Sequence, residues 1–157
     1  PVLRNSFYNA ASLPSTLKFV FNPDPTRVKT FNTVNYEGSN GWEITSLVSD
    51  KTGAQPAIPA VTDGLFVEDT SQRIWSYDEG LYTENGIPYR AGFDRKQNRY
   101  MAAIKNSSTI PIAGQVLIGP DNTGIKAYYT TVTIKTDATT FLGQPKQLFA
   151  VGATYGR

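Results

Sequence analysis

Short stretches of alternating apolar and polar residues, separated by turn-forming residues, recur along the 157-residue chain. Between Pro14 and Asp24, the apolar residues Leu17, Phe19 and Phe21 take every second position. This period is typical of a strand with one buried face. An Asn-Pro-Asp-Pro sequence ends the stretch, and its two prolines remove backbone donors and force the chain to turn. The pattern predicts a strand closed by a turn.

Residues 28–49 have the pattern of a β-hairpin. Two stretches of β-forming residues flank a Glu-Gly-Ser-Asn-Gly connection, which supplies the flexible backbone of a tight turn. In the second stretch we expect Trp42, Ile44 and Val48 on one face of the strand. We also expect Tyr36 and Trp42, at the facing ends of the two strands, to pack against each other.

The rest of the chain predicts further short strands joined by loops. Ile125–Thr136 is the clearest, because it is dense in Thr, Tyr, Ile and Val. An Asn-Gly pair at positions 85–86 predicts a second hairpin. Lys51–Gly64 is rich in Gly, Ala and Pro and has no steady period, so we expect a long surface loop. Other strand candidates are Arg99–Ile104, Gln115–Ile118 and Gln147–Thr154, with short apolar pieces at 74–77 and 81–83.

These elements predict an all-β fold: an antiparallel β-sandwich or barrel-like domain with long loops and very little helix. The length suits a single β-rich domain over residues 1–157. The chain starts with Pro rather than Met, so we expect the C-terminal part or a processed fragment of a larger polypeptide. No apolar run approaches the roughly 20 residues needed to cross a bilayer, so no membrane span is expected.

Composition and charge narrow the possible functions. Nine Tyr, eight Phe and two Trp favour sheets and protein interfaces. The formal net charge is only +2, and the signs are interspersed. The densest basic group, which we interpret as turn and strand-edge charges, is Arg90, Arg95, Lys96 and Arg99, diluted by Asp94. We therefore expect no specific nucleic-acid binding.

Cys and His are both absent, which removes thiolate nucleophiles, the usual zinc ligands and the commonest general base. No phosphate-binding glycine loop, nucleophile elbow or dinucleotide fingerprint is present. We therefore expect no enzyme activity, no cofactor and no small-molecule ligand. A glycosidase needs only two carboxylates, and Asp78, Glu79 and Glu84 lie near several aromatic residues. Asp78 and Glu79 are more simply explained as the polar tip of a turn.

Two binding alternatives, calcium binding and carbohydrate binding, rest on side chains of a type suited to each ligand. Asp121, Asn122 and Asp137 carry oxygen ligands for calcium, but their spacing does not match a calcium loop. Trp42, Trp75 and the tyrosines offer flat faces for sugar rings. Aromatic residues on strands are more often part of a core or a subunit interface. The Asn106-Ser107-Ser108 sequon is uninformative without evidence of secretion.

Several segments together resemble the tail-associated structural proteins of tailed bacteriophages, including crAss-like phages. The first is Phe21–Trp42, with its Phe-Asn start, Val-Lys-Thr-Phe core and Asn-Tyr-Glu-Gly-Ser end. The resemblance continues, in the same order, through Gly80–Tyr82, Tyr89–Tyr100, Gly124–Tyr129 and Lys146–Val151. It therefore covers most of the chain after Thr16.

The resemblance implies a virion component of the tail or neck, such as the muzzle or nozzle, assembled in the host cytoplasm. Its partners would be other copies of itself and other virion tail or neck proteins. It supplies no catalytic residues. A carbohydrate-binding or receptor-binding β-sandwich at a virion or cell surface is the alternative.

We expect the sheets of such a domain to bury Phe19, Phe31, Trp42, Tyr128 and Phe149. The loop Lys51–Gly64 and the segment Tyr89–Tyr100 are expected to contact neighbouring subunits. The predicted partner-interface residues are Arg90, Phe93, Arg95, Tyr100, Trp75 and Tyr77.

Overall fold

The computed structural model describes residues 13–49, 73–77, 82–84, 87–89, 92–104, 123–141 and 143–156. In this part of the chain there are ten strands and no helix, so no helix that could cross a membrane is found there. The strands are β1 (Thr16–Phe21), β2 (Lys29–Gly38), β3 (Trp42–Ser49), β4 (Tyr82–Glu84), β5 (Ile87–Tyr89), β6 (Asp94–Lys96), β7 (Arg99–Ala103), β8 (Ile125–Ala127), β9 (Thr130–Thr136) and β10 (Leu148–Gly156).

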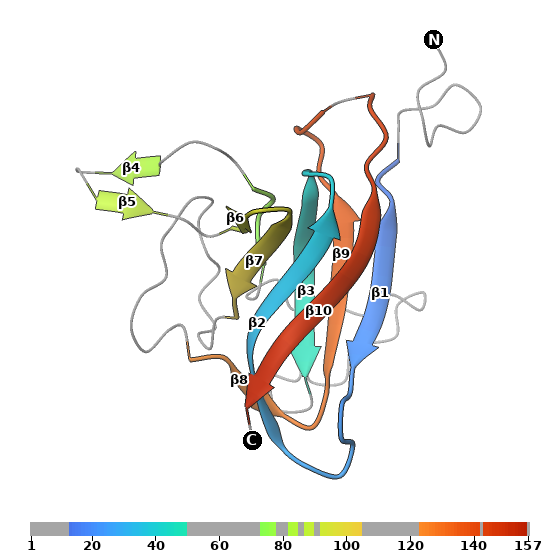
Figure 1. Ribbon diagram of the computed structural model, residues 1–157, viewed down its shortest axis with the longest axis vertical. Helices are drawn as coiled ribbons and strands as arrows, with labels where there is room; N and C mark the ends of the chain where they lie inside the picture. The colour runs from blue at the N-terminus through green and yellow to red at the C-terminus, as the bar shows by residue number, and fades with distance from the viewer. Residues whose placement is uncertain are drawn as a thin grey trace, which may run out of the picture.

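Two antiparallel sheets pack together (Figure 1). The first sheet has the order β1-β9-β3, and the second has the order β10-β2-β7-β6, with β8 also paired to β2. The prediction of an all-β fold is confirmed. Of the two predicted architectures, the structure has the sandwich and not a closed barrel. In the described residues no strand belongs to both of these sheets, so the edges of the two sheets stay separate.

The predicted hairpin around Asn85-Gly86 is confirmed, because β4 pairs with β5 in antiparallel register. The predicted hairpin over residues 28–49 is wrong. Although β2 and β3 form at the expected places, they lie in different sheets. Gly41 has φ +103°, and a Cβ there would lie 2.6 Å from Lys146 Cε, so a glycine is needed where the chain crosses between the sheets. Tyr36 and Trp42 thus belong to one core cluster from opposite sheets.

The strand predicted over Ile125–Thr136 is also divided between the sheets. β8 pairs with β2, and β9 lies between β1 and β3. The chain crosses at Tyr128 and Tyr129, which are both about two-fifths exposed. The expected burial of Tyr128 is therefore wrong, because this residue lies in the connection and not on a sheet face.

A bulge corrects the predicted face of β3. Ile44 pairs with Ile134 and Ser46 with Thr133, so Thr45 has no direct partner on β9. This extra residue shifts the alternation. Trp42 and Ile44 are buried as expected, but Leu47 is buried in place of Val48.

The core lies between the two sheets, and its buried apolar side chains come from both. The burial of Phe31 and Trp42 is confirmed, and Phe19 is partly buried against the same cluster. Phe149 is 73% exposed, so its expected burial is wrong. It is the extra residue of a bulge in β10, where Leu148 pairs with Gly38 and Ala150 with Glu37. The core cluster consists of Phe31, Val34, Tyr36, Trp42, Ile44, Leu47, Ile74, Phe93, Tyr100, Ala102, Ile104, Ile125, Ala127, Val132 and Ile134.

Candidate subunit-packing surface

One side of the sandwich, which we call the closed side, consists of β3, β6, β7 and the segment 73–77 that joins them. Ile74 exchanges two backbone hydrogen bonds with Ile44 of β3, each 2.9 Å long. The next residue, Trp75, accepts a 3.0 Å backbone hydrogen bond from Phe93, just before β6. The segment 73–77 therefore covers the edge of the first sheet and ties it to the second.

Aromatic rings fill the closed side. Tyr36 stacks on Tyr100, with ring centroids 4.7 Å apart, and it meets Phe93 edge-on at 4.9 Å. Tyr77 contacts Tyr100 at 5.8 Å. Burial raises the pKa of the Tyr36 phenol well above its ordinary value near 10, and the neighbouring Tyr100 adds to this shift. Phe93 and Tyr100 are at most 5% exposed, so they hold the domain together from within.

The structure brings three predicted interface residues, Tyr77, Phe93 and Tyr100, into this one cluster. Their role in contacting a partner stays a prediction. Arg95 lies apart from them on the exposed strand β6, where its Nε donates to the Gln97 carbonyl. Arg90 and the loop Lys51–Gly64 lie outside the described residues.

Trp75 lies beside a small group of charges on the closed side. The Arg73 guanidinium carbon sits 3.6 Å from the centroid of the Trp75 ring, so one face of the indole is covered. Arg73 also pairs with the buried carboxylate of Glu43 at 3.3 Å, and Lys135 reaches the same carboxylate at 3.7 Å. Trp42 is buried, and its indole nitrogen donates to the Gln147 carbonyl. The Trp42 indole and one face of the Trp75 indole are thus not free to stack on a sugar ring.

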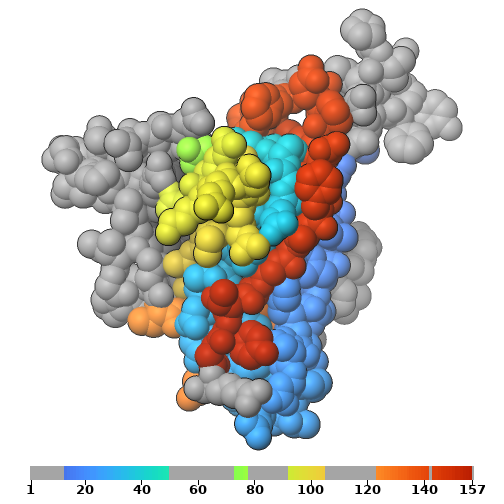
Figure 2. All heavy atoms as spheres, in the orientation of Figure 1, coloured from blue at the N-terminus to red at the C-terminus, as the bar shows by residue number. Residues whose placement is uncertain are grey.

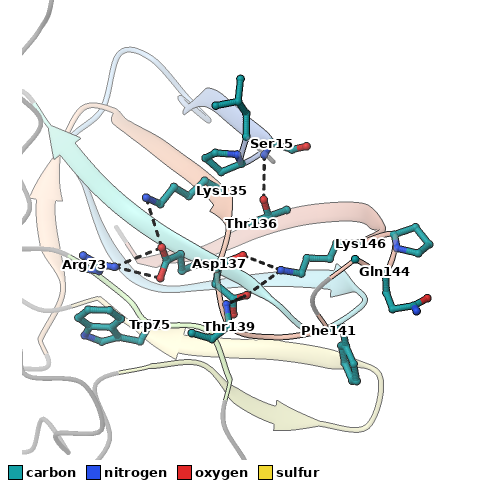
Figure 3. A pocket seen from close by; sticks show the side chains of 16 residues that line it. Ser15, Arg73, Trp75, Lys135, Thr136, Asp137, Thr139, Phe141, Gln144 and Lys146 are labelled. Atoms are coloured by element: carbon teal, nitrogen blue, oxygen red, sulfur yellow. Dashed lines mark hydrogen bonds and ion pairs between the residues drawn. The ribbon is translucent and has the colours of Figure 1, made fainter. Parts of the chain in front are cut away.

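A groove of about 800 Å³ lies where β1 begins and β9 ends (Figure 3). Its charged residues are engaged with one another. Lys146 Nζ lies 2.8 Å from Asp137 Oδ1 and 2.9 Å from the Asp137 carbonyl oxygen, and both side chains are buried. Thr140 donates to both carboxylate oxygens of Asp137 through its amide and hydroxyl. This polar staple, Asp137–Thr140–Lys146, fixes the connection between β9 and β10.

The staple lowers the pKa of the Asp137 carboxyl below its ordinary value near 3.8. Burial by itself would raise this pKa, but the hydrogen bonds from Lys146, Ser76 and Thr140 outweigh it. Asp137 is thus committed to its protein partners. Among the described residues, no group of three His, Cys, Asp or Glu side chains could hold a metal ion.

The remaining side chains of the alternative sites are not placed. Asp121 and Asn122 of the suggested calcium site, and Asp78 and Glu79 of the suggested glycosidase site, lie outside the described residues. The Asn106 sequon lies outside them too. Glu84 is in β4, where only the backbone is described.

The opposite side of the sandwich, which we call the open side, consists of the two edge strands β1 and β10. Their upper parts lie beside each other on the right of Figures 1 and 2. Exposed large apolar side chains occur on both strands. They are Leu17 and Val20 on β1, at 45% and 55% exposed, and Phe149 and Tyr155 on β10, at 73% and 40% exposed.

Sequence reasoning missed the open side. It placed Leu17 and Phe149 on strands correctly, but the period of two does not show whether a strand lies at an edge. A bulge such as the one at Phe149 also leaves no clear signal in the sequence. The sequence shows the turn-forming residues before β10. However, the crossover that places β10 at the edge of the second sheet depends on pairing between residues far apart in the chain.

Comparison with known families gives one clear match. A family model described as the Crassvirus muzzle protein C-terminal domain matches residues 3–107, which is more than half of the chain. The match includes β1, β2, β3 and the closed side, and it ends before β8. No curated protein matches the chain.

Proposed function

Because the chain belongs to the Crassvirus muzzle protein C-terminal domain family and is thus a phage virion component, we propose that it packs against other virion subunits through its open side. In this proposal it is a structural part of the tail or neck, and it works by burying surface. The observation that carries the proposal is the exposure of Leu17, Val20, Phe149 and Tyr155 on the two edge strands.

Scattered apolar side chains are normal on protein surfaces and need no explanation. These four differ because they all occur on edge strands, one strand from each sheet of the sandwich. Burying apolar area contributes roughly 25 cal/mol per Å², and a Phe ring is among the largest side chains that an interface can bury. Phe149 is the most exposed of the large apolar residues in the described chain, so we propose it as the central anchor.

We also propose that the β6–β7 hairpin contacts a neighbouring subunit. Its turn residues Gln97 and Asn98 lie between the exposed, charged strand β6, with Arg95 at its centre, and the exposed Arg99 at the start of β7. Exposed charges at the rim of an interface fix its register and partner choice more than its strength. Arg95→Ala should therefore weaken assembly more than folding.

Substitution of Phe149 tests the proposal, and Phe141 provides a matched control. Both phenylalanines are exposed, at 73% and 61%, but Phe141 lies in the connection before β10 and lines the groove instead of the edge. Phe141 has φ +45°, a conformation that Asp tolerates, so Phe141→Asp should fold normally. Thermal unfolding of each purified chain would verify that both variants are folded.

The readout is the number of copies in purified virions, measured by quantitative mass spectrometry after complementation with each variant. We expect Phe149→Asp to reduce incorporation by about tenfold or more, because burying an unpaired charge should cost more than the roughly 1.4 kcal/mol that corresponds to a tenfold change. Phe141→Asp should be incorporated like the original chain. Equal incorporation of the two folded variants would contradict the proposed packing role of the open side.

A further inference from the structure

The crossing from β2 to β3 contains an Asn-Gly pair whose two residues contact each other. Gly41 donates its backbone N–H to the side-chain oxygen Oδ1 of Asn40, and these two atoms lie 2.7 Å apart. The side-chain nitrogen Nδ2 of Asn40 donates to the Tyr77 carbonyl oxygen at 3.0 Å. The carboxamide of Asn40 therefore lies directly against the backbone nitrogen of the next residue.

The fold requires a glycine after Asn40. Gly41 has φ +103°, and a Cβ there would lie 2.6 Å from Lys146 Cε. A glycine has no side chain that could hinder the approach of its nitrogen to the preceding carboxamide. Gly41 also lies between the end of β2 and the start of β3, so its N–H belongs to neither strand. Asn40 is half-buried, so solvent reaches part of it.

We propose that Asn40 is a site of spontaneous deamidation, with Gly41 as the internal nucleophile. The Gly41 nitrogen loses its proton to hydroxide and attacks the side-chain carbon Cγ of Asn40. The N–Cγ bond forms, the Cγ–Nδ2 bond breaks, and Nδ2 takes up a proton and leaves as ammonia. Water then opens the resulting succinimide ring at either carbonyl carbon, which gives aspartate or isoaspartate. The net reaction consumes a water molecule and releases an ammonia molecule.

The geometry brings the two reacting groups together before the reaction starts. Holding them in contact removes much of the entropy cost of bringing a nucleophile to its target. A rotation of the Asn40 carboxamide about χ2 turns Cγ toward the Gly41 nitrogen in place of Oδ1. This rotation breaks the hydrogen bond to Tyr77, so the reaction competes with a contact of the closed side.

Deamidation would loosen the contact between the crossing and the closed side. An aspartate at position 40 has no N–H to donate, so its carboxylate would face the Tyr77 carbonyl, and both groups are hydrogen-bond acceptors. Tyr77 belongs to the segment 73–77, which ties the two sheets together. The modification would therefore act on the part of the chain that supplies its stability.

Isoaspartate would also disturb the connection between β9 and β10. This product adds a carbon atom to the main chain at position 40. On one side of it, Ser39 donates its backbone N–H to the Gln147 carbonyl at 2.9 Å, and on the other the Gly41 carbonyl accepts from the Asp137 N–H at 2.8 Å. A longer main chain between Ser39 and Gly41 does not fit both hydrogen bonds at once.

Peptide mass spectrometry of the purified, folded chain, incubated at mildly alkaline pH, tests the reaction. Asn98 is the internal control, because it is exposed in the turn between β6 and β7 but is followed by Arg99. We expect conversion to the acid to be about tenfold or more faster at Asn40 than at Asn98. An isoaspartyl methyltransferase should label position 40. Asn40→Gln should abolish this label, because its longer side chain would have to close a larger ring.

The same chain in denaturant shows that the chosen conditions support the reaction. A folded chain that keeps Asn40 unmodified while the denatured chain converts would overturn the inference. Equal conversion at Asn40 and Asn98 in the folded chain would overturn it too.

Melting temperatures of two aspartate variants test the consequence. We expect Asn40→Asp to lower the melting temperature by about 3 °C or more, because it removes a half-buried donor. Asn98→Asp, at an exposed turn, should change it by about 1 °C or less. An Asn40→Asp chain as stable as the original would overturn the proposed effect on the closed side. These measurements involve no assembly, so they are independent of the proposed packing role.

Discussion

The two sides of this sandwich are built from similar residues but are stabilised in different ways. On the closed side, the segment 73–77 bridges the sheets and the rings of Tyr36, Phe93 and Tyr100 are packed together. On the open side, Phe149 and Val20 project into solvent, and β10 is held by its ladder with β2 and by the polar staple at its start. The closed side therefore supplies stability to the single chain, while the open side is the surface that we propose for a partner.

The largest expected difference concerns two phenylalanines on opposite sides. Phe93→Ala on the closed side removes a ring that is 2% exposed and should reduce the free energy of unfolding by about 3 kcal/mol or more. Phe149→Ala should change it by about 0.5 kcal/mol or less, because its ring packs little within the chain. Denaturant unfolding of the monomeric chain measures both. Similar losses would remove the distinction between the two sides.

The polar staple provides the next test, because it holds the start of β10, on the open side, by charge instead of by apolar packing. Lys146→Met leaves the Asp137 carboxylate buried without its cation and should cost about 3 kcal/mol in unfolding free energy. Adding Asp137→Asn to this variant should recover part of the loss, since the buried charge is then removed. A double variant as unstable as the single one would show that the charge pair is not the cause.

Opposite pH limits should weaken the ring cluster around Tyr36 and the polar staple at Asp137 separately. The pKa of Asp137 is lowered in the fold, so its contribution is present above pH 3.8 and is lost as the pH falls through the folded-state value. The pKa of Tyr36 is raised, so its contribution is complete below pH 10 and declines as the pH rises above that, because only the unfolded chain loses the proton.

The free energy of unfolding, plotted against pH, tests both expectations. Tyr36→Phe should change the alkaline branch of this curve, and the Asp137→Asn/Lys146→Met variant should change its acid branch. Each substitution should leave the other branch in place. A Tyr36→Phe chain with an unchanged alkaline decline would show that a different group is responsible.

The smallest expected effect comes from an ion pair on the outer surface of the second sheet. Arg99 pairs with Glu37 at 2.7 Å between β7 and β2, with both side chains about half exposed. Exposed pairs contribute roughly 0–1 kcal/mol. Arg99→Met should therefore lower the unfolding free energy by less than about 1 kcal/mol and become neutral at high salt. A loss comparable to that of Phe93→Ala would show that the closed side depends on surface charge as well as on its rings.

The sequence predicted strands well where its signals are local. The alternation of Leu17, Phe19 and Phe21 marked β1, and Asn85-Gly86 marked the β4–β5 hairpin. The resemblance to phage tail proteins also pointed to the family that the chain belongs to. Strand pairing was harder, because a short Gly-rich connection such as the one ending at Gly41 is compatible with a hairpin and with a crossing between sheets.

The predicted interface residues show the same limit. Phe93 and Tyr100 were predicted at an interface from their residue type, and in the single chain their rings pack with Tyr36 in the core. Their contact with a partner stays a prediction. Phe149 was expected in the core and is exposed by a bulge. Aromatic residues suit either environment, so the residue type alone could not decide between them.

The sequence by itself determined the all-β class, the places of most strands and the absence of cysteine and histidine chemistry, because these depend on residue type and on a period of two. The tertiary structure decided which strands lie at the sheet edges. It also decided where the bulges in β3 and β10 change the alternation of buried and exposed residues. Edges and bulges result from pairing between residues far apart in the chain, and this pairing minimises the free energy of the whole sandwich. That is why the exposure of Val20 and Phe149 could be identified only from the tertiary structure.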